Sequence, residues 1–270
     1  MTEQSPQGES NAPSKQPAKR SLKTFALETG VVVAVSGVMC AFLLHETPAV
    51  RVAAPWSQCR SNLKQIGLAL HHYHDVYGSF PPAYVADKNG QPMHSWRVLL
   101  LPYLDRKELY EEYDFDEPWN GPNNLKLAER IPRVFRCPSF EDRRSSEASD
   151  AYLTSYFAVT GPGSAFEGAN STSFSDVSDG NSKTFLVAEV ATQLRLWTQP
   201  RDVTIAHIHF QFSDKVADRL NHQSGAQFLF GDGSVDFINR TIPTDLLTAL
   251  TTIAGGEEIG DYWRRRIPDP

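Results

Sequence analysis

Two pairs of histidines have spacings that metal sites use. His71 and His74 are three residues apart, which places them on one face of a helix, and His207 and His209 alternate along a segment expected to be a strand. Histidine beside an aromatic residue such as Tyr73 is also common at interfaces. Since nothing in the sequence brings the two pairs together, we expect no histidine-bound metal.

His222 and Asp232 are residue types that form catalytic dyads. The residues between them are expected to form a strand, which puts the two roughly 30 Å apart along the chain. We therefore expect structural roles: Asp232 and Gly233 make a turn, and His222 caps or hydrogen-bonds the strand entry. The sequence also lacks a nucleophile elbow, a zinc-protease motif, a phosphate loop and a dinucleotide fingerprint. We predict that the protein is not an enzyme.

Asp176, Asp179 and Asn181, in D-V-S-D-G-N, carry oxygen atoms of the kind that bind calcium. Their spacing does not match the EF-hand loop. Asp-Gly-Asn is also an ordinary turn signal before a strand. Calcium is therefore the one cofactor that the sequence suggests, with a simple turn as the alternative.

The composition argues against nucleic acid as a partner. The chain has 270 residues with 26 Lys and Arg against 32 Asp and Glu, a net charge of −6. Phosphate backbones are bound by basic surfaces, which this balance does not provide. Three cysteines are too few for a disulfide scaffold, and none has zinc-finger spacing.

An apolar segment near the N-terminus predicts a membrane anchor. As a helix, residues 25–44 span roughly 30 Å, enough to cross a bilayer. A cleaved secretory signal begins similarly, but its apolar core is only about 7 to 15 residues long. Basic residues before the segment place the N-terminus in the cytoplasm. We predict a disordered cytoplasmic tail at 1–24, a single transmembrane helix at 25–45 in the cytoplasmic membrane, and an exterior, periplasmic domain at 46–270.

Glu28 is a carboxylate within this apolar segment. At mid-span it would cost about 2.5 kcal/mol or more. It lies close enough to the segment boundary to reach the interface. The alternative is that it contacts a partner, such as the amino group of a neighbouring subunit in an assembly.

Apolar spacings of alternately three and four residues predict an amphipathic helix that begins near Trp56, after Pro48 and Pro55, and ends at Gly78. Shorter helices are predicted at 95–105, 123–129 and 244–253. Strands are predicted at 152–159, 184–190, 203–212, 226–230 and 234–238, the last two joined by a hairpin at 231–233. This order indicates an α+β fold with the amphipathic helix packed on an antiparallel sheet.

The segment C-R-S-N-L-K-Q-I-G-L-A-L-H-H-Y-H-D-V-Y-G-S-F-P-P at 59–82 resembles the signature of a bacterial pilin-like family, domain of unknown function 1559. Later blocks agree with it: F-R-C-P-S at 135–139, S-Y-F-A-V-T-G-P-G-S-A-F at 155–166, D-V-S-D-G-N-S-K-T at 176–184, and His222 followed after nine residues by Asp232 and Gly233. The resemblance implies a pilin-like structural or interaction protein in a pilus-like or type II secretion-like apparatus. Some pseudopilins bind calcium in a late loop, which bears on the D-V-S-D-G-N segment.

Members of that family usually begin like type IV prepilins, with Gly before a Phe and Glu four residues after that Phe. Here Lys23 and Thr24 precede Phe25, and Glu28 is three residues after it. We therefore expect a permanent anchor without prepilin cleavage. The expected partners are the lipid bilayer and pilin-like subunits or other envelope proteins. The alternative function is a membrane-tethered solute- or glycan-binding domain, with Trp119 and Trp197 as possible stacking faces.

Cys59 and Cys137 lie outside the membrane in this topology. An oxidising exterior would let them form a disulfide. The alternative is two buried thiols that pack as small apolar groups. Cys40 falls within the predicted membrane helix and is expected to stay unpaired.

Overall fold

The computed structural model describes residues 33, 35–40, 48–141, 152–193, 195–219, 222, 224–257, 259 and 260. The chain divides into two compact units, Met1–Arg51 and Val52–Pro270. The predicted tail, Glu28 and most of the predicted membrane helix lie outside the described residues. Within the described part of the chain, no helix is both long and apolar enough to cross a membrane.

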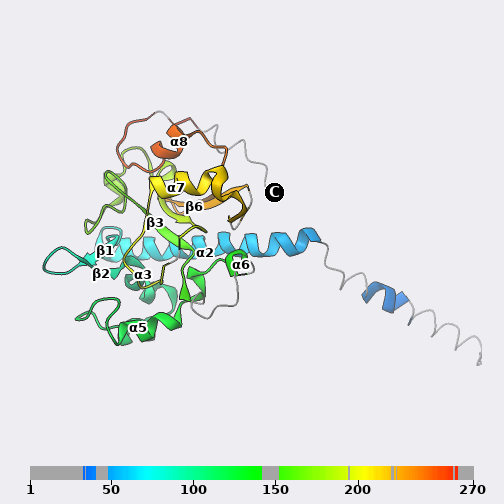
Figure 1. Cartoon of the computed structure of the whole chain (residues 1–270), viewed down its shortest axis with the longest axis horizontal. Coiled ribbons are helices and arrows are strands. Elements are labelled where there is room, and N and C mark those ends of the chain that lie inside the picture. Colours follow the sequence, from blue (N-terminus) through cyan, green and yellow to red (C-terminus); the bar gives the residue numbers. More distant parts are fainter. Residues whose placement is uncertain are drawn as a thin grey trace, which may run out of the picture. The chain divides into compact units, whose positions relative to one another are not determined.

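The helix α2 (Pro48–Tyr77) forms from the predicted apolar stripe (Figure 1). Cys59, Leu63, Ile66 and Leu70 are fully buried, because the spacing brings them to one face of the helix. The predicted start near Trp56 was wrong. The helix already includes Pro55, since a proline removes one hydrogen bond from a helix without always ending it.

Five strands form one sheet in the order β5-β3-β4-β6-β7. Their bounds are β3 (Tyr156–Thr160), β4 (Phe185–Glu189), β5 (Val203–Thr204), β6 (Gly225–Phe230) and β7 (Val235–Asn239). The pairs β3·β4, β4·β6 and β6·β7 are antiparallel, as predicted, but β3 and β5 are parallel. The sheet is mixed because β4 returns the chain to the end where β3 begins, and β5 then leaves in the direction of β3.

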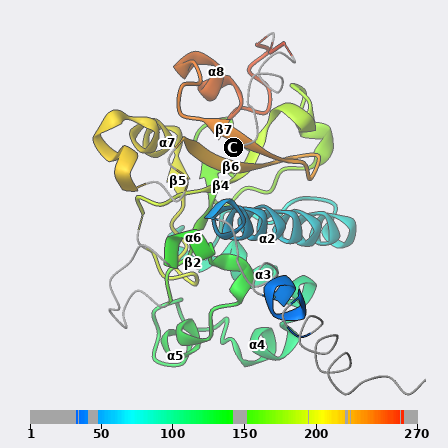
Figure 2. The same ribbon diagram turned by 90° about the vertical axis from the view of Figure 1, so that its right-hand side faces the viewer.

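The helix α2 lies on one face of the sheet (Figure 2), and a separate hydrophobic core lies on each face. Alternate residues of β3 face opposite sides: Tyr156 and Ala158 belong to the core under α2, whereas Phe157 and Val159 belong to the other. The second core is covered by α7 (Ile205–Phe212) and α8 (Thr244–Ala249). The domain is therefore an α+β fold with helices on both faces of its sheet.

Residues 203–212, predicted as one strand, are mostly helical. Only β5 is extended, and α7 follows at once. Thr204 is the N-cap residue of α7. In its capping box, the Thr204 N–H donates to His207 Nδ1 at 3.1 Å. Ile208 and Phe212 are buried one turn apart. His207 and His209 therefore do not share a strand face as predicted.

Smaller elements surround these layers. Two strands, β1 (Tyr84–Ala86) and β2 (Pro92–Ser95), form an antiparallel pair. The short α-helices are α3 (Trp96–Leu99), α4 (Lys107–Glu112), α5 (Asn124–Leu127) and α6 (Pro138–Glu141). The 3-10 helices are η1 (Leu101–Leu104), η2 (Ala128–Arg130), η3 (Arg133–Phe135), η5 (Phe174–Asp176), η6 (Asn181–Lys183) and η7 (Asp214–Arg219).

Candidate functional site

A disulfide joins α2 to the segment before α6. Cys59 lies on α2, and Cys137 lies between η3 and α6. Their Cα atoms are 5.1 Å apart, and both residues are fully buried. Of the two alternatives left open by the sequence, the structure has the disulfide. Cys40 is exposed and has no disulfide partner.

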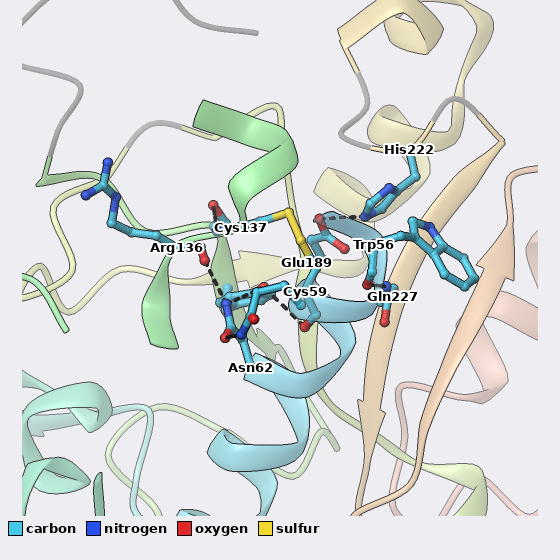
Figure 3. Close-up of a disulfide and its surroundings, with 11 residues drawn as sticks. Trp56, Cys59, Asn62, Arg136, Cys137, Glu189, His222 and Gln227 are labelled. Atoms are coloured by element: carbon cyan, nitrogen blue, oxygen red, sulfur yellow. Dashed lines mark hydrogen bonds and ion pairs between the residues drawn. A yellow bond between two sulfur atoms is a disulfide. The ribbon is translucent and has the colours of Figure 1, made fainter. Parts of the chain in front are cut away.

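Glu189 and His222 lie beside this disulfide (Figure 3). Glu189 ends β4, and His222 precedes β6, where it forms an isolated bridge with Gly225. The His222 Nε2 atom is 3.3 Å from Glu189 Oε1, and the side chains are 8% and 1% exposed. A buried carboxylate is costly unless it is paired. His222 supplies a partner to this one.

Two aromatic rings pack against the His222 ring. The ring of Trp56 contacts it edge to face, with centroids 5.7 Å apart, and Phe237 lies at 6.4 Å. Gln227 of β6 donates to the Trp56 carbonyl oxygen at 3.0 Å (Figure 3). These contacts hold the His222 ring between α2 and the sheet.

Hydrogen bonds to the backbone hold both cysteines in place. The Tyr156 hydroxyl donates to the Cys59 carbonyl oxygen at 3.2 Å, and the Cys137 N–H donates to the Ser155 hydroxyl at 3.0 Å. Burial, reinforced by the Glu189 carboxylate, raises the pKa of Tyr156 well above its ordinary value. The phenol therefore stays protonated and keeps donating.

Asp232 and Gly233 lie at the other end of β6 from His222. Asp232 Oδ1 accepts the Ser234 N–H at 2.9 Å, and Gly233 has φ of +79°. Because the length of β6 separates His222 from Asp232, the two residues do not form a dyad.

Three of the sequence motifs meet at this hairpin. His71 Nε2, from α2, donates to the Gly231 carbonyl oxygen at 2.9 Å. The Asp232 N–H donates to the Asn181 carbonyl oxygen at 3.1 Å. His74 accepts the Phe174 N–H through Nε2 at 3.2 Å. The imidazoles of α2 thus bind the backbone of two separate loops.

Asp176 and Asp179, the two carboxylates among the three candidate calcium ligands, accept backbone hydrogen bonds. Asp176 Oδ2 accepts the Ser173 N–H at 2.7 Å, which lowers the pKa of Asp176 below its ordinary range. The Asp179 carboxylate accepts the Gly255 and Gly256 N–H groups at 2.6 and 2.9 Å. Each carboxylate therefore already holds a loop in the structure.

A cleft of about 400 Å³ opens between β1, the loop after β3 and the segment that leads to β5. Its lining includes Tyr84, Glu167, Arg201 and Asp202. Trp197 is not part of it. Its ring is fully buried, and its Nε1 donates to the Ala128 carbonyl oxygen at 2.9 Å. Trp197 therefore serves core packing rather than stacking on a ligand.

Glu189 is the site residue that sequence reasoning missed. It interrupts the apolar strand F-L-V-A-E-V, and a carboxylate in a buried strand demands a partner. That interruption is the signal that would have marked it. Its partner, His222, is 33 residues further along the chain and comes near only when β4 pairs with β6.

Comparison with known proteins gives one match. The sequence profile of the family described as Protein of unknown function (DUF1559) matches residues 48–216. No curated protein and no solved structure matches the chain. The matched region covers more than half of the 270 residues and includes α2, both bonded cysteines and Glu189. The chain therefore belongs to the DUF1559 family.

Proposed function

We propose that this protein is a non-catalytic, pilin-like structural or interaction protein of the cell envelope. In this proposal, residues 25–45 hold it in the cytoplasmic membrane, and the domain from residue 46 lies outside. The observation that carries the proposal is α2. It follows the apolar segment directly in the chain, and one face of it covers the antiparallel part of the sheet.

The disulfide supports an exterior position for the domain. Disulfides persist in oxidising compartments and are rare in the cytosol. The bond between Cys59 and Cys137 lies within the hydrophobic core and ties α2 to the rest of the domain. It is therefore part of the fold rather than a surface feature.

The described residues of the apolar segment support the anchor. Residues 35–40 are helical, and the side chains of Val33 and Met39 are 67% and 62% exposed. Four exposed apolar side chains at Val33, Val35, Val38 and Met39 favour a lipid or protein covering over water.

Membrane extraction of the full chain from a Gram-negative host tests the anchor and its orientation. We expect the protein to stay in the pellet after alkaline carbonate treatment and its domain to be digested by protease added to spheroplasts. The double variant Val33→Lys, Val38→Lys should be released from the pellet. Val76→Lys, at an exposed apolar position on α2, is the matched control and should stay. Wild-type protein in the supernatant would refute the anchor, and a protease-protected domain would refute the orientation.

The cleft favours a second candidate, a solute- or glycan-binding exterior domain. Its volume falls in the range of small-molecule sites, about 300–1,000 Å³. Tyr84 contributes an aromatic ring to the lining of the cleft, and Glu167 and Arg201 contribute charged groups. Calorimetry against a panel of neutral oligosaccharides and amino acids tests this candidate. Binding that is lost in Tyr84→Ala but kept in Tyr110→Ala would support it, and a panel without any binding would reject it.

A further inference from the structure

Four side chains with metal-binding atoms converge on one buried point (Figure 3). They are Cys59 of α2, Cys137 of the segment before α6, Glu189 at the end of β4 and His222 of the segment before β6. Their two sulfurs, carboxylate oxygen and imidazole nitrogen all lie within 4.8 Å of one another. Within the described part of the chain, no other group of three or more His, Cys, Asp or Glu side chains is this close.

Zinc binds thiolate sulfur, imidazole nitrogen and carboxylate oxygen, which are the three kinds of donor gathered here. Thiolates bind zinc at about 2.3 Å and nitrogen or oxygen at about 2.0–2.2 Å, so tetrahedral neighbours are about 3.3–3.8 Å apart. His222 Nε2 and Glu189 Oε1 already have a separation of 3.3 Å. The sulfurs are closer than this only because they are bonded. Reduction removes the bond and lets the thiolates move apart to the distance that a shared metal requires.

The ligand residues are positioned by contacts other than the sulfur–sulfur bond. Cys59 and Cys137 have the hydrogen bonds to Tyr156 and Ser155 described above. The carbonyl oxygen of Glu189 accepts from Gln211 Nε2 at 3.0 Å. Because such outer contacts orient metal ligands, much of the geometry should survive reduction.

Charge also favours a cation at this point. Two thiolates and a carboxylate in a core position would be desolvated and would repel one another. A divalent cation offsets that charge directly. The burial of all four residues, at 9% exposure or less for each, suits a structural site without an open coordination position.

We propose that the reduced form of this protein binds one zinc ion through Cys59, Cys137, Glu189 and His222, so that either a disulfide or a metal holds this part of the core. A dithiol reductant passes two electrons and two protons to the disulfide and is itself oxidised to a disulfide. The two resulting thiols release their protons to water when zinc binds. The inference does not depend on where the domain resides.

Zinc content of the full-length protein in detergent tests the proposal. Tris(2-carboxyethyl)phosphine is a suitable reductant because it is a phosphine without thiols that compete for zinc. It ends as the phosphine oxide, with oxygen from water and the water's protons on the two thiols. After incubation with zinc and desalting, mass spectrometry should find one zinc per chain in reduced protein and none in oxidised protein. Reduced protein without stoichiometric zinc would overturn the proposal.

Ligand variants test whether the zinc lies in this site. Glu189→Gln and His222→Asn keep both cysteines, and each should weaken zinc binding by about tenfold or more, judged by competition with a chromogenic chelator. Glu167→Gln and Cys40→Ser are matched controls and should bind as the wild type does. If Glu189→Gln and His222→Asn bind zinc as tightly as the wild type, the cysteines bind it alone and the four-residue site is wrong. Circular dichroism of each reduced variant distinguishes loss of the site from loss of the fold.

Discussion

Arg97 donates to Asp202 at 2.6 Å, although the two side chains are only 0% and 2% exposed. Asp202 also accepts the Trp96 Nε1–H at 3.1 Å and the Ala158 N–H at 2.7 Å. Arg97 donates in addition to the Tyr156 carbonyl oxygen at 2.9 Å. The pair therefore joins α3, β3 and the segment before β5, and removing either partner leaves a buried charge.

Replacing Arg97 should cost much of the stability of the domain. Arg97→Met leaves the Asp202 carboxylate in the core without its counter-charge, and we expect the free energy of unfolding to fall by about 3–5 kcal/mol. Urea unfolding followed by tryptophan fluorescence measures it. Arg130→Met is the control, because Arg130 pairs with Glu112 at half-exposed positions and should cost about 1 kcal/mol or less. Equal losses in the two variants would contradict this.

His94 should make stability depend on pH. Its Nε2 donates to the Phe115 carbonyl oxygen and its Nδ1 accepts from the Tyr113 hydroxyl, both at 3.1 Å, so the pair of contacts suits a neutral ring. Burial lowers the pKa of His94 below its ordinary value of 6.5. Below that pH the unfolded state binds more protons than the folded state. The contribution of His94 to the free energy of unfolding is therefore fully present above about pH 6.5. It is lost as the pH falls from there through the pKa of His94 in the folded state.

Urea unfolding at several pH values between about 7.5 and 5 checks this effect. The free energy of unfolding should decline less steeply in His94→Gln than in the wild type. His207→Gln offers a parallel test, since burial and the nearby Arg195 and Arg201 lower the pKa of His207. A slope unchanged in His94→Gln would show that its ring does not stay neutral in the fold.

Gly231 should tolerate alanine less well than Gly67. A Cβ at Gly231 would lie 2.9 Å from the Asn181 carbonyl oxygen, which belongs to the backbone. A Cβ at Gly67 would meet Leu229 Cδ1 at 2.7 Å, the movable end of a side chain, and alanine also favours the helix by about 1 kcal/mol. We expect Gly231→Ala to lose about 1–3 kcal/mol and Gly67→Ala less, by thermal unfolding. A larger loss at Gly67 would contradict the close packing of the hairpin on Asn181.

The chain should not be cut before Phe25 in protein recovered from its native membranes. Lys23 and Thr24 precede Phe25 where prepilins have glycine, so we expect intact mass and N-terminal sequencing to find the residues before Phe25 still attached. A methylated N-terminus at Phe25 would overturn this and would make a pilus or pseudopilus subunit the leading function.

Local patterns predicted some elements well. The stripe of α2 depends on spacing within one helix, and the hairpin at 231–233 depends on an Asp-Gly turn, so both could be predicted from neighbouring residues. In α7 the alternating sequence I-A-H-I-H-F-Q-F matches the pattern of a strand. The capping box at Thr204 is the local feature that indicates a helix instead. The parallel pairing of β3 with β5 joins residues 44 apart, which no local pattern reports.

The candidate site could be predicted only in part for the same reason. Two cysteines in a domain predicted to lie outside the membrane favour a disulfide, but their neighbours Glu189 and His222 come from segments that meet only through the sheet. Arg97 and Asp202 are likewise charged residues whose pairing spans 105 positions. Their burial cannot be read from hydrophobic spacing, because both side chains are charged.

The disulfide also determines how the domain would respond to a pulling force. Cys59 and Cys137 are separated by 78 positions, and the covalent ring that they close contains β1, β2 and α3 to α5. Tension applied between the start of α2 and the C-terminal part of the chain would pass through the sulfur–sulfur bond and bypass this ring. The residues between the two cysteines would then not extend. Fully extended, they would span roughly 270 Å at about 3.5 Å per residue. Under load, the bond limits how far the domain can lengthen.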